Sequence, residues 1–292
     1  MKLILNTTEA LIYVIDLENN EIIYANTKCI EEFGNVIGKT CYKVLQKDKE
    51  CLCEFCPLAE IENPLEYLLE TIFEWENKNS LNNKHYLFKD RIILWENNKK
   101  VQLKTAIDIT KQKKIEEKIL ELAHYDELTK LPNRVLFKEY LQRAMKRSGR
   151  TSEYNALLFI DLDNFKIIND TLGHTIGDKV LVEVAQRIKN SVRENDIVGR
   201  IGGDEFVVLI DINEKNIKLI EEKLIAITEK ILYSVKSAYG VIKNDLRISA
   251  SIGIKFFNND DFSIVELMEH ADIAMYKAKL NGKNTFCFSS HF

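Results

Sequence analysis

Four carboxylates lie where predicted strands end or turn, and their types and spacing suit metal-assisted phosphate chemistry. Asp204 and Glu205 directly follow a Gly-Gly pair in RIGGDEF, a pattern that predicts a hairpin with close backbone approach. Asp161 and Asp163 lie in the apolar run NALLFIDLDNF, which predicts a buried strand. Oxygen ligands of this kind suit Mg²⁺, which shares its coordination with substrate phosphates. Paired acids at a turn are usually only solvated, and their pairing with the Asp161 strand favours the cation site.

Cysteines form the second group that could do chemistry. Cys41, Cys51, Cys53 and Cys56 follow the pattern C-x9-C-x-C-x2-C. Four thiols are enough for a tetrahedral zinc site or an iron–sulfur cluster. The spacing differs from the usual pair of CxxC motifs, so two alternatives stay open: reduced cysteines without a ligand, and a redox-switching pair.

Length and composition bound the classes of protein that can hold these groups. The chain has 292 residues, of which 46% are hydrophobic and 29% charged, so we expect about two folded domains. The formal net charge of -4 argues against a protein that coats nucleic acid. No apolar run approaches the roughly 20 residues that span a bilayer, and the N-terminal run is too short for a signal peptide. We therefore expect a cytoplasmic protein without nucleic-acid or membrane partners.

The N-terminal part is expected to form strands and hairpins around the cysteines. Alternating, β-branched segments predict strands at 10–16, 21–26, 71–76, 84–94 and 99–109, and a short helix at 27–33. The charged segment 110–122 predicts a helix with Ile115, Ile119 and Leu122 on one stripe. This stripe is explained equally well by a short coiled coil and by a surface helix docked on its own domain.

The C-terminal part is expected to be an α+β domain. Helices are predicted after Asn133 and at 177–192, 216–235 and 263–282, and strands at 155–165, 247–257 and 284–288, with a strand–turn–strand at 196–211. Helices and strands alternate without a strict βαβ repeat, which indicates a mixed sheet.

Several motifs in this order resemble the GGDEF family of diguanylate cyclases over about residues 123–292. They are DELTKLPNR, FIDLDNFKIINDTLGHTIGD, RENDIVGRIGGDEF, ASIGI and ADIAMYKAKLNGKN. The resemblance implies a nucleotidyl-cyclase-like domain with a ferredoxin-like core that binds one GTP. Two such domains face each other in a homodimer, each 3′-hydroxyl attacks the α-phosphate of the other GTP, and the products are cyclic di-GMP and pyrophosphate.

By this resemblance, the acidic residues become metal ligands and catalytic groups. Asp161, the carbonyl of Leu162 and Asp204 are expected to bind Mg²⁺ or Mn²⁺, and Glu205 to help hold a second ion. Asp204 lies at the position of the family's proposed proton acceptor. The expected chemistry is nucleotidyl transfer by positioning and charge neutralisation.

The resemblance also implies contacts with the nucleotide. Asn169 and Asp178 match the guanine-reading pair, because a carboxylate accepts from guanine N–H groups that adenine does not present in that pattern; an alternative role for Asp178 is to cap a helix. His174 lies between them. The basic residues expected near phosphate are Lys166, Arg200, Lys279 and Lys283.

Arg193 and Asp196 form an RxxD pattern just before the Gly-Gly pair. In the family, this position is an inhibitory site where Arg stacks on the guanine of the product. We therefore expect cyclic di-GMP to inhibit the enzyme.

The N-terminal part resembles a PAS domain, since its strands end in AIDIT before a charged helix. The expected organisation is a PAS-like antiparallel sheet domain at 1–110, a helical signalling linker at 111–123 and the cyclase domain at 124–292. Two other functions remain open: a catalytically silent receptor for GTP or cyclic di-GMP, and a metal or redox sensor that acts through protein partners.

Overall fold

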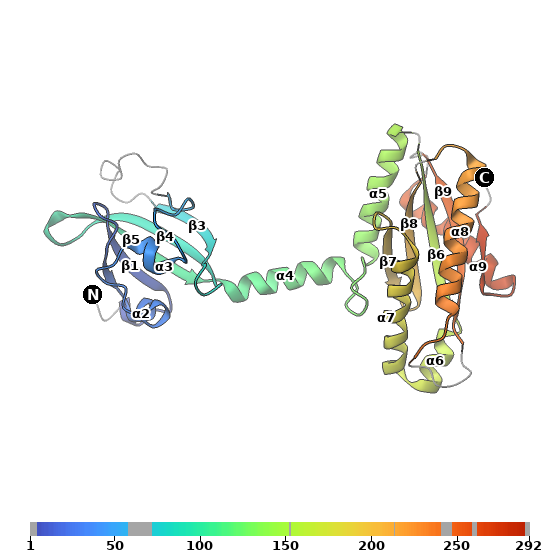
Figure 1. Ribbon diagram of the computed structural model, residues 1–292, viewed down its shortest axis with the longest axis horizontal. Coiled ribbons are helices and arrows are strands. Elements are labelled where there is room, and N and C mark those ends of the chain that lie inside the picture. Colours follow the sequence, from blue (N-terminus) through green and yellow to red (C-terminus); the bar gives the residue numbers. More distant parts are fainter. Residues whose placement is uncertain are drawn as a thin grey trace. The chain divides into compact units, whose positions relative to one another are not determined.

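A computed structural model describes residues 5–57, 72–151, 153–212, 214–240, 247–258 and 262–289. The chain divides into two compact units, Met1–Lys118 and Ile119–Phe292, whose elements are labelled in Figure 1. Each unit contains one five-stranded sheet.

The N-terminal unit is built on an antiparallel sheet with strand order β2-β1-β5-β4-β3. Its strands are β1 Leu11–Asp16, β2 Ile22–Ala25, β3 Ile72–Lys78, β4 His85–Leu94 and β5 Lys100–Asp108. Among the described residues, its helices include α2 Thr27–Phe33, α3 Cys41–Leu45 and the short η3 Glu96–Asn98. The predicted antiparallel sheet is confirmed, and only the first residue of the strand predicted at 71–76 lies outside the described residues.

Side-chain alternation and one buried amide fix the inner face of this sheet. Along β4, Tyr86, Phe88 and Asp90 are buried while Lys89 is exposed, as expected for a strand with one face toward a core. The Asn26 side chain accepts hydrogen bonds from the amides of Ile12 and Cys29, both at 3.0 Å. It therefore caps α2 and ties that helix to β1.

Helix α4, Thr110–His124, has no buried residue. The side chains of Ile115, Ile119 and Leu122 are 49%, 59% and 48% exposed. Exposed apolar side chains fit both the short coiled coil and the docked surface helix, and both stay predictions.

The C-terminal unit has a mixed sheet with strand order β10-β9-β6-β8-β7. Its strands are β6 Tyr154–Asp163, β7 Ile197–Gly202, β8 Glu205–Ile212, β9 Ser249–Phe257 and β10 Thr285–Phe288. Its helices are α5 Arg134–Thr151, α6 Phe165–Leu172, α7 His174–Ser191, α8 Ile217–Lys236 and α9 Ile264–Leu280. β10 pairs in parallel with β9 and the other pairs are antiparallel, which confirms the mixed α/β content.

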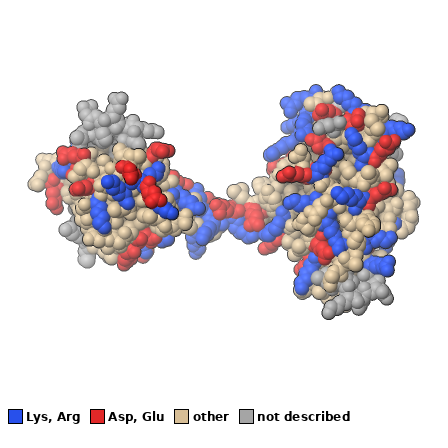
Figure 2. Space-filling model, viewed as in Figure 1, with Lys and Arg blue, Asp and Glu red and all other residues tan. Residues whose placement is uncertain are grey.

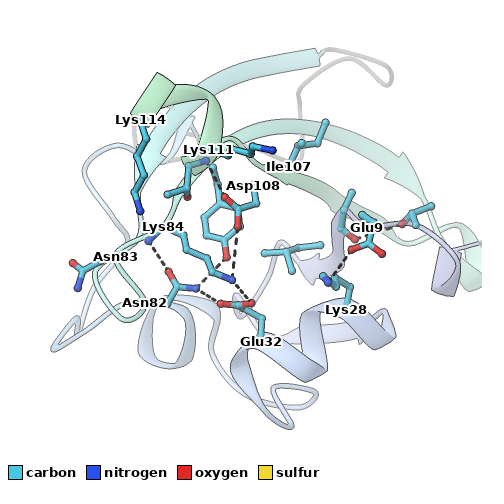
Figure 3. A pocket seen from close by; sticks show the side chains of 15 residues that line it. Glu9, Lys28, Glu32, Asn82, Asn83, Lys84, Ile107, Asp108, Lys111 and Lys114 are labelled. Atoms are coloured by element: carbon cyan, nitrogen blue, oxygen red, sulfur yellow. Dashed lines mark hydrogen bonds and ion pairs between the residues drawn. The ribbon is translucent and has the colours of Figure 1, made fainter. Parts of the chain in front are cut away.

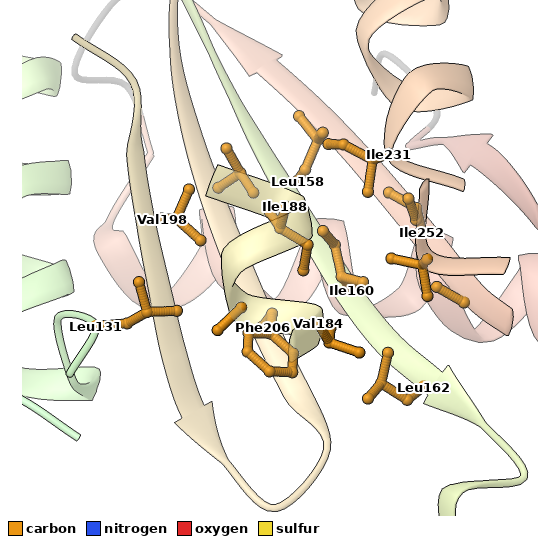
Figure 4. Close-up of a cluster of buried hydrophobic side chains, with 14 of the residues drawn as sticks. Leu131, Leu158, Ile160, Leu162, Val184, Ile188, Val198, Phe206, Ile231 and Ile252 are labelled. Carbon is orange, nitrogen blue, oxygen red and sulfur yellow. The ribbon is translucent and has the colours of Figure 1, made fainter. Parts of the chain in front are cut away.

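Helices cover both faces of this sheet. Side chains of α7 and α8 pack on one face of the central strands, and those of α5 and α9 pack on the other. Figure 4 shows the first of these cores, where Ile160 of β6 and Phe206 of β8 lie among residues of the covering helices. All of the sheet-facing residues drawn there are nearly or fully buried, which holds the strand ends that carry the acidic residues in fixed register.

Gly253 in the ASIGI motif allows α9 to pack directly against β9. A Cβ atom at this position would lie 1.9 Å from the carbonyl oxygen of Ala271 and 2.2 Å from the amide nitrogen of Met275. Only glycine permits that approach. Because α9 carries Lys279, the close packing also sets the position of this lysine.

Candidate active site

Asp161 and Glu205 lie directly opposite each other on the neighbouring strands β6 and β8. The Leu162 amide donates to the Asp204 carbonyl at 3.2 Å, so the strand pairing continues into the turn. Gly203 has φ +53 in that turn, a conformation that favours glycine. The turn therefore presents Asp204 next to the strand pair, as the sequence predicts.

Burial and like charges make this cluster a poor place for isolated carboxylates. Burial raises the pKa of Asp161, and the neighbouring Asp204 raises it further. The pKa of Glu205 is raised by burial first and then by Asp161, Asp272 and Asp204. Lys279 opposes both effects, and its Nζ lies 2.7 Å from Asp161 Oδ2. A second cation would relieve the remaining repulsion.

The donor set fits a hard divalent cation by chemistry. It consists of carboxylate oxygens at one end of the sheet, which are the ligands Mg²⁺ prefers. As the side chains stand in the described part of the chain, no three or more His, Cys, Asp or Glu residues converge to hold a metal ion. Asp161 is instead paired with Lys279, so the metal contacts predicted for Asp161, Leu162, Asp204 and Glu205 stay predictions.

Arg200 supports the turn from the other side. Its Nη1 donates to both carboxylate oxygens of Asp126, at 2.9 and 3.1 Å. Its Nε and Nη2 donate to the Gly203 carbonyl at 3.0 and 2.7 Å. The guanidinium thus joins the DELTKLPNR segment to the Gly-Gly turn, and its predicted contact with substrate stays a prediction.

Asp163 has a structural role rather than a place among the acids of the site. Its carboxylate accepts from the hydroxyls of Ser249 and Ser251, at 2.6 and 2.7 Å, and from the Asn284 amide at 3.0 Å. These bonds tie the end of β6 to β9 and to the loop before β10. The same loop holds Lys283, whose Nζ donates to Asn164 Oδ1 at 2.9 Å.

The residues predicted to read guanine lie where α6 and α7 meet. A Cβ atom on Gly177 would lie 1.9 Å from Asn169 Oδ1, so Asn169 packs directly against the residue that precedes Asp178. Asp178 and His174 are exposed, as is Lys166 on α6.

The helix-cap alternative for Asp178 is wrong. Helix α7 begins at His174, three residues before the predicted start at 177, and its N-cap is Gly173 with φ +83. Asp178 therefore lies inside the helix. Its exposed carboxylate is not used to begin that helix and is available for a ligand.

The RxxD residues border a cavity of about 280 Å³, which is also lined by residues of β8 and α8. Arg193 is exposed, whereas Asp196 is only 8% exposed. The Asp196 carboxylate accepts from the amides of Arg193 at 2.9 Å and Asp211 at 3.2 Å. Asp196 therefore shapes the loop, while Arg193 is free to reach a ligand.

The expected four-thiol metal site is not assembled within the described ranges. Cys41, Cys53 and Cys56 line one small cavity, whereas Cys51 is exposed and does not line it. The zinc or iron–sulfur expectation therefore has no support. The spacing of the cysteines along the chain could not show that Cys51 lies outside the cavity that the other three thiols line.

Sequence reasoning missed three residues that shape the active site. Asp126 anchors Arg200, Asn164 holds Lys283, and Asp272 adds to the negative charge around Glu205. All three lie within motifs that the sequence singles out, but only the fold shows what they contact.

A groove of about 1060 Å³ crosses the N-terminal unit. Figure 3 shows that Lys84 lies between Glu32 of α2 and Asp108 at the end of β5, at 2.6 and 3.7 Å. The Asp108 carboxylate also accepts from the Thr110 amide at 2.9 Å, at the first residue of α4. The groove thus adjoins the start of the linker helix.

Charge is mixed over the visible surface. Figure 2 shows Lys, Arg, Asp and Glu interspersed, without a broad area of one sign. No helix in the described ranges is long and apolar enough to cross a membrane.

Comparisons with known proteins concern the C-terminal part of the chain. The family model described as "Diguanylate cyclase, GGDEF domain" matches residues 123–285. A bifunctional diguanylate cyclase/cyclic di-GMP phosphodiesterase, MucR of Pseudomonas aeruginosa, is 40% identical over 65% of this chain and 27% of its own length. Diguanylate cyclase TpbB of the same species is 38% identical over 56% of this chain and 37% of its own length. The chain thus spans well under two thirds of these relatives.

Solved structures give the same result for the fold. The GGDEF domain of TpbB from Pseudomonas aeruginosa matches with a TM-score of 0.52 and 37% identity, over 57% of this chain and 95% of that one. The coiled coil and GGDEF domain of DgcB from Caulobacter crescentus, solved with cyclic di-GMP, matches with a TM-score of 0.53 and 27% identity, over 62% and 93%.

Proposed function

This chain belongs to the GGDEF domain family of diguanylate cyclases, and from that premise we propose that it condenses two GTP molecules into cyclic di-GMP and two pyrophosphates. One observation carries the proposal. Asp161 and Glu205 lie in register beside Asp204, with Lys279 2.7 Å from Asp161. Acidic residues and a lysine at one end of the sheet support a site for divalent cations and phosphate.

The chemistry is a double nucleotidyl transfer. In each half, a 3′-oxygen forms a bond to the α-phosphorus of the other GTP, the bond to the bridging oxygen breaks, and pyrophosphate leaves. We assign the proton of the hydroxyl to Asp204. Asp161, the Leu162 carbonyl, Asp204 and Glu205 would hold Mg²⁺ or Mn²⁺, which when bound neutralises triphosphate charge. Lys279 and Lys283 would face phosphate.

Guanine selection is assigned to Asn169 and Asp178. An exposed carboxylate at Asp178 accepts hydrogen bonds from the N1–H and N2–H groups of guanine. The packing of Asn169 against Gly177, the residue before Asp178, supports this assignment.

Regulation follows from the need for two active sites. One domain binds one GTP, so whatever sets how two C-terminal units meet also sets the rate. We assign this role to a PAS-like N-terminal unit and to pairing of two α4 helices through Ile115, Ile119 and Leu122, which are exposed. Product would inhibit at Arg193 and Asp196.

Incubation of the full chain with GTP and MgCl₂, followed by nucleotide chromatography, tests the proposal. We expect cyclic di-GMP from the wild type and none from Asp204→Ala. Glu229→Gln, a change of an exposed acid on α8, is the matched control and should leave the rate unchanged. GTP binding without product in the wild type would overturn the cyclase assignment and favour a silent receptor.

A further inference from the structure

Three thiols share one small cavity in the N-terminal unit, and the proposed function does not use them. Cys41, Cys53 and Cys56 line a space of about 40 Å³ whose walls are mostly aromatic and aliphatic. Lys104 of β5 is the charged residue in this lining. A cluster of nucleophilic side chains beside a buried cation is unusual in a core, since burying a charge is costly unless it is paired.

Lys104 is held in place as a cation. Its side chain is 5% exposed, and its Nζ lies 2.9 Å from Asp90 Oδ2 and 5.0 Å from the centre of the Trp75 ring. Burial opposes the charge on Lys104, but the attraction of Asp90 and then of Cys56 outweighs burial and raises its pKa. The same ammonium donates to Cys56 Sγ at 3.6 Å.

One oxygen of the carboxylate that pairs with Lys104 accepts hydrogen bonds from two further side chains. Asp90 Oδ2 also accepts from Gln102 Nε2 at 3.1 Å and from Trp75 Nε1 at 3.0 Å. These bonds fix the lysine against the sheet and keep its ammonium beside the cysteine. Lys104 therefore meets two groups of potential negative charge, the Asp90 carboxylate and the Cys56 sulfur.

Cys53 is close enough to Cys56 to be its disulfide partner. The Cys56 amide donates to the Cys53 carbonyl at 2.8 Å, which is the bond that closes a four-residue turn. Such a turn brings the two Cα atoms within about 7 Å, the reach of a disulfide. Burial raises the pKa of Cys53, and that of Cys41 to about 11. Both therefore remain thiols at neutral pH, and Cys56 is the member of the cluster whose sulfur meets a cation.

We propose that Cys56 and Cys53 form an oxidation-sensitive dithiol that reacts with hydrogen peroxide, an activity that goes beyond the cyclase. The Cys56 sulfur attacks one peroxide oxygen, the O–O bond breaks, and the products are a sulfenic acid and water. The Cys53 sulfur then attacks the Cys56 sulfur and loses its proton, the S–O bond breaks, and a second water leaves. Two thiols are oxidised to one disulfide, and one peroxide is reduced to two waters.

The size of the cavity selects the oxidant. A space of about 40 Å³ admits molecules of the size of water, each of which needs about 10–15 Å³ of such volume. Hydrogen peroxide fits this limit. Because Cys53 is buried, we expect a bulky disulfide such as oxidised glutathione to react poorly with the pair, and a comparison of the two oxidants separates the two sources of oxidation.

The test uses the full chain, reduced and then exposed to a small excess of hydrogen peroxide before alkylation and peptide mass mapping. We expect a Cys53–Cys56 disulfide, seen as the loss of two hydrogens, and we expect little reaction with oxidised glutathione. In Cys53→Ser, oxidation should stop at a Cys56 sulfenic acid that dimedone traps. Cys51→Ser, which removes an exposed thiol of the same loop, is the matched control and should leave disulfide formation unchanged.

The role of Lys104 is tested by removing both charges at once. Asp90→Asn with Lys104→Gln keeps hydrogen-bonding groups in place but removes the ammonium that donates to the Cys56 sulfur, and it should slow oxidation about tenfold. If that variant does not fold, the dimedone experiment with Cys53→Ser still decides whether Cys56 is the residue that peroxide oxidises. Equal oxidation of all thiols, a disulfide to Cys41, or a bound zinc ion that protects the thiols would each overturn the proposal.

Discussion

The Arg200 guanidinium donates hydrogen bonds to both carboxylate oxygens of Asp126, although the two residues are 74 positions apart in the chain. The side chains of Arg200 and Asp126 are 10% and 22% exposed. Because the same guanidinium holds the Gly203 carbonyl, this contact links the segment just after α4 to the turn that carries Asp204. A change at the end of the linker helix therefore has a direct physical route to the active site.

Replacing Arg200 by lysine tests this link. Lysine keeps the charge but cannot make the paired bonds, so we expect the C-terminal unit to lose about 2 kcal/mol of unfolding free energy. The cyclase kcat should fall, since the turn loses its support. Thermal unfolding and steady-state kinetics are the measurements. Arg143→Lys, at a side chain that is 73% exposed, is the control. Unchanged stability with a higher KM for GTP would instead place Arg200 on the substrate.

Replacing Glu205 by glutamine should stabilise the metal-free protein while it abolishes cyclase activity. Burial first, and then the charges of Asp161, Asp272 and Asp204, disfavour the ionised form of Glu205, with Lys279 as the opposing charge. The pKa of Glu205 is raised in the folded state, so the wild type loses stability as the pH rises from about 4.3, the unfolded-state value, through the folded-state pKa. Glutamine at this position does not ionise, so the variant does not lose stability over this pH range.

We therefore expect the melting temperature of the C-terminal unit in Glu205→Gln to be about 2 °C higher at pH 7. The gain should disappear below pH 4, where the carboxyl is protonated in both states. Calorimetry in the presence of a chelator gives both values, and Glu229→Gln is the control. MgCl₂ should reduce the difference in melting temperature between the two proteins, because it should stabilise the wild type more than the variant. A lower melting temperature for the variant at pH 7 would contradict the repulsion.

The element types could be predicted from the sequence because their apolar periods are strong. The β6 run is apolar on both faces, and α9 is bounded by a Ser263 cap and Gly282. The expected closeness of Asp161 and the turn is observed, although a strand that is apolar on both faces does not by itself fix its register. The start of α7 could not be predicted, since it depends on the left-handed φ of Gly173.

Contacts between distant segments could not be predicted from patterns of residue type. An arginine can bind phosphate or a carboxylate equally well, and only the fold shows that Arg200 contacts Asp126. The spacing of the cysteines shows four thiols but not that Cys51 is exposed while Cys53 is buried. Lys104, which gives that cluster its charge, lies in a predicted strand and 48 residues beyond Cys56.

Gly177→Ala should weaken GTP binding selectively. The new Cβ would overlap Asn169 Oδ1 at 1.9 Å, so the Asn169 side chain must move from its present position. We expect the KM for GTP to rise about tenfold, because the recognition pair is misplaced. Gly240→Ala, at a glycine whose added Cβ would meet no atom of the described residues within 4 Å, should leave KM unchanged. An unaltered KM in Gly177→Ala would remove Asn169 from guanine recognition.

Substitutions of Arg193 and Asp196 should have different effects on stability, although both residues are assigned to product inhibition. Arg193 is exposed, so Arg193→Ala should abolish inhibition by cyclic di-GMP and leave the melting temperature unchanged. Asp196 is buried and its carboxylate holds the amides of Arg193 and Asp211. Asp196→Ala leaves these amides without their acceptor and should also cost about 1–3 kcal/mol of unfolding free energy.

The measurements are initial rates at increasing cyclic di-GMP and thermal unfolding of each variant. Lys189→Ala, near the end of the preceding helix α7, is the control for removing a positive charge close to the loop, and it should retain inhibition. If Arg193→Ala is still inhibited like the wild type, the product binds elsewhere. If Asp196→Ala loses inhibition without any loss of stability, Asp196 contacts the product directly and its bonds to the two amides contribute little to the fold.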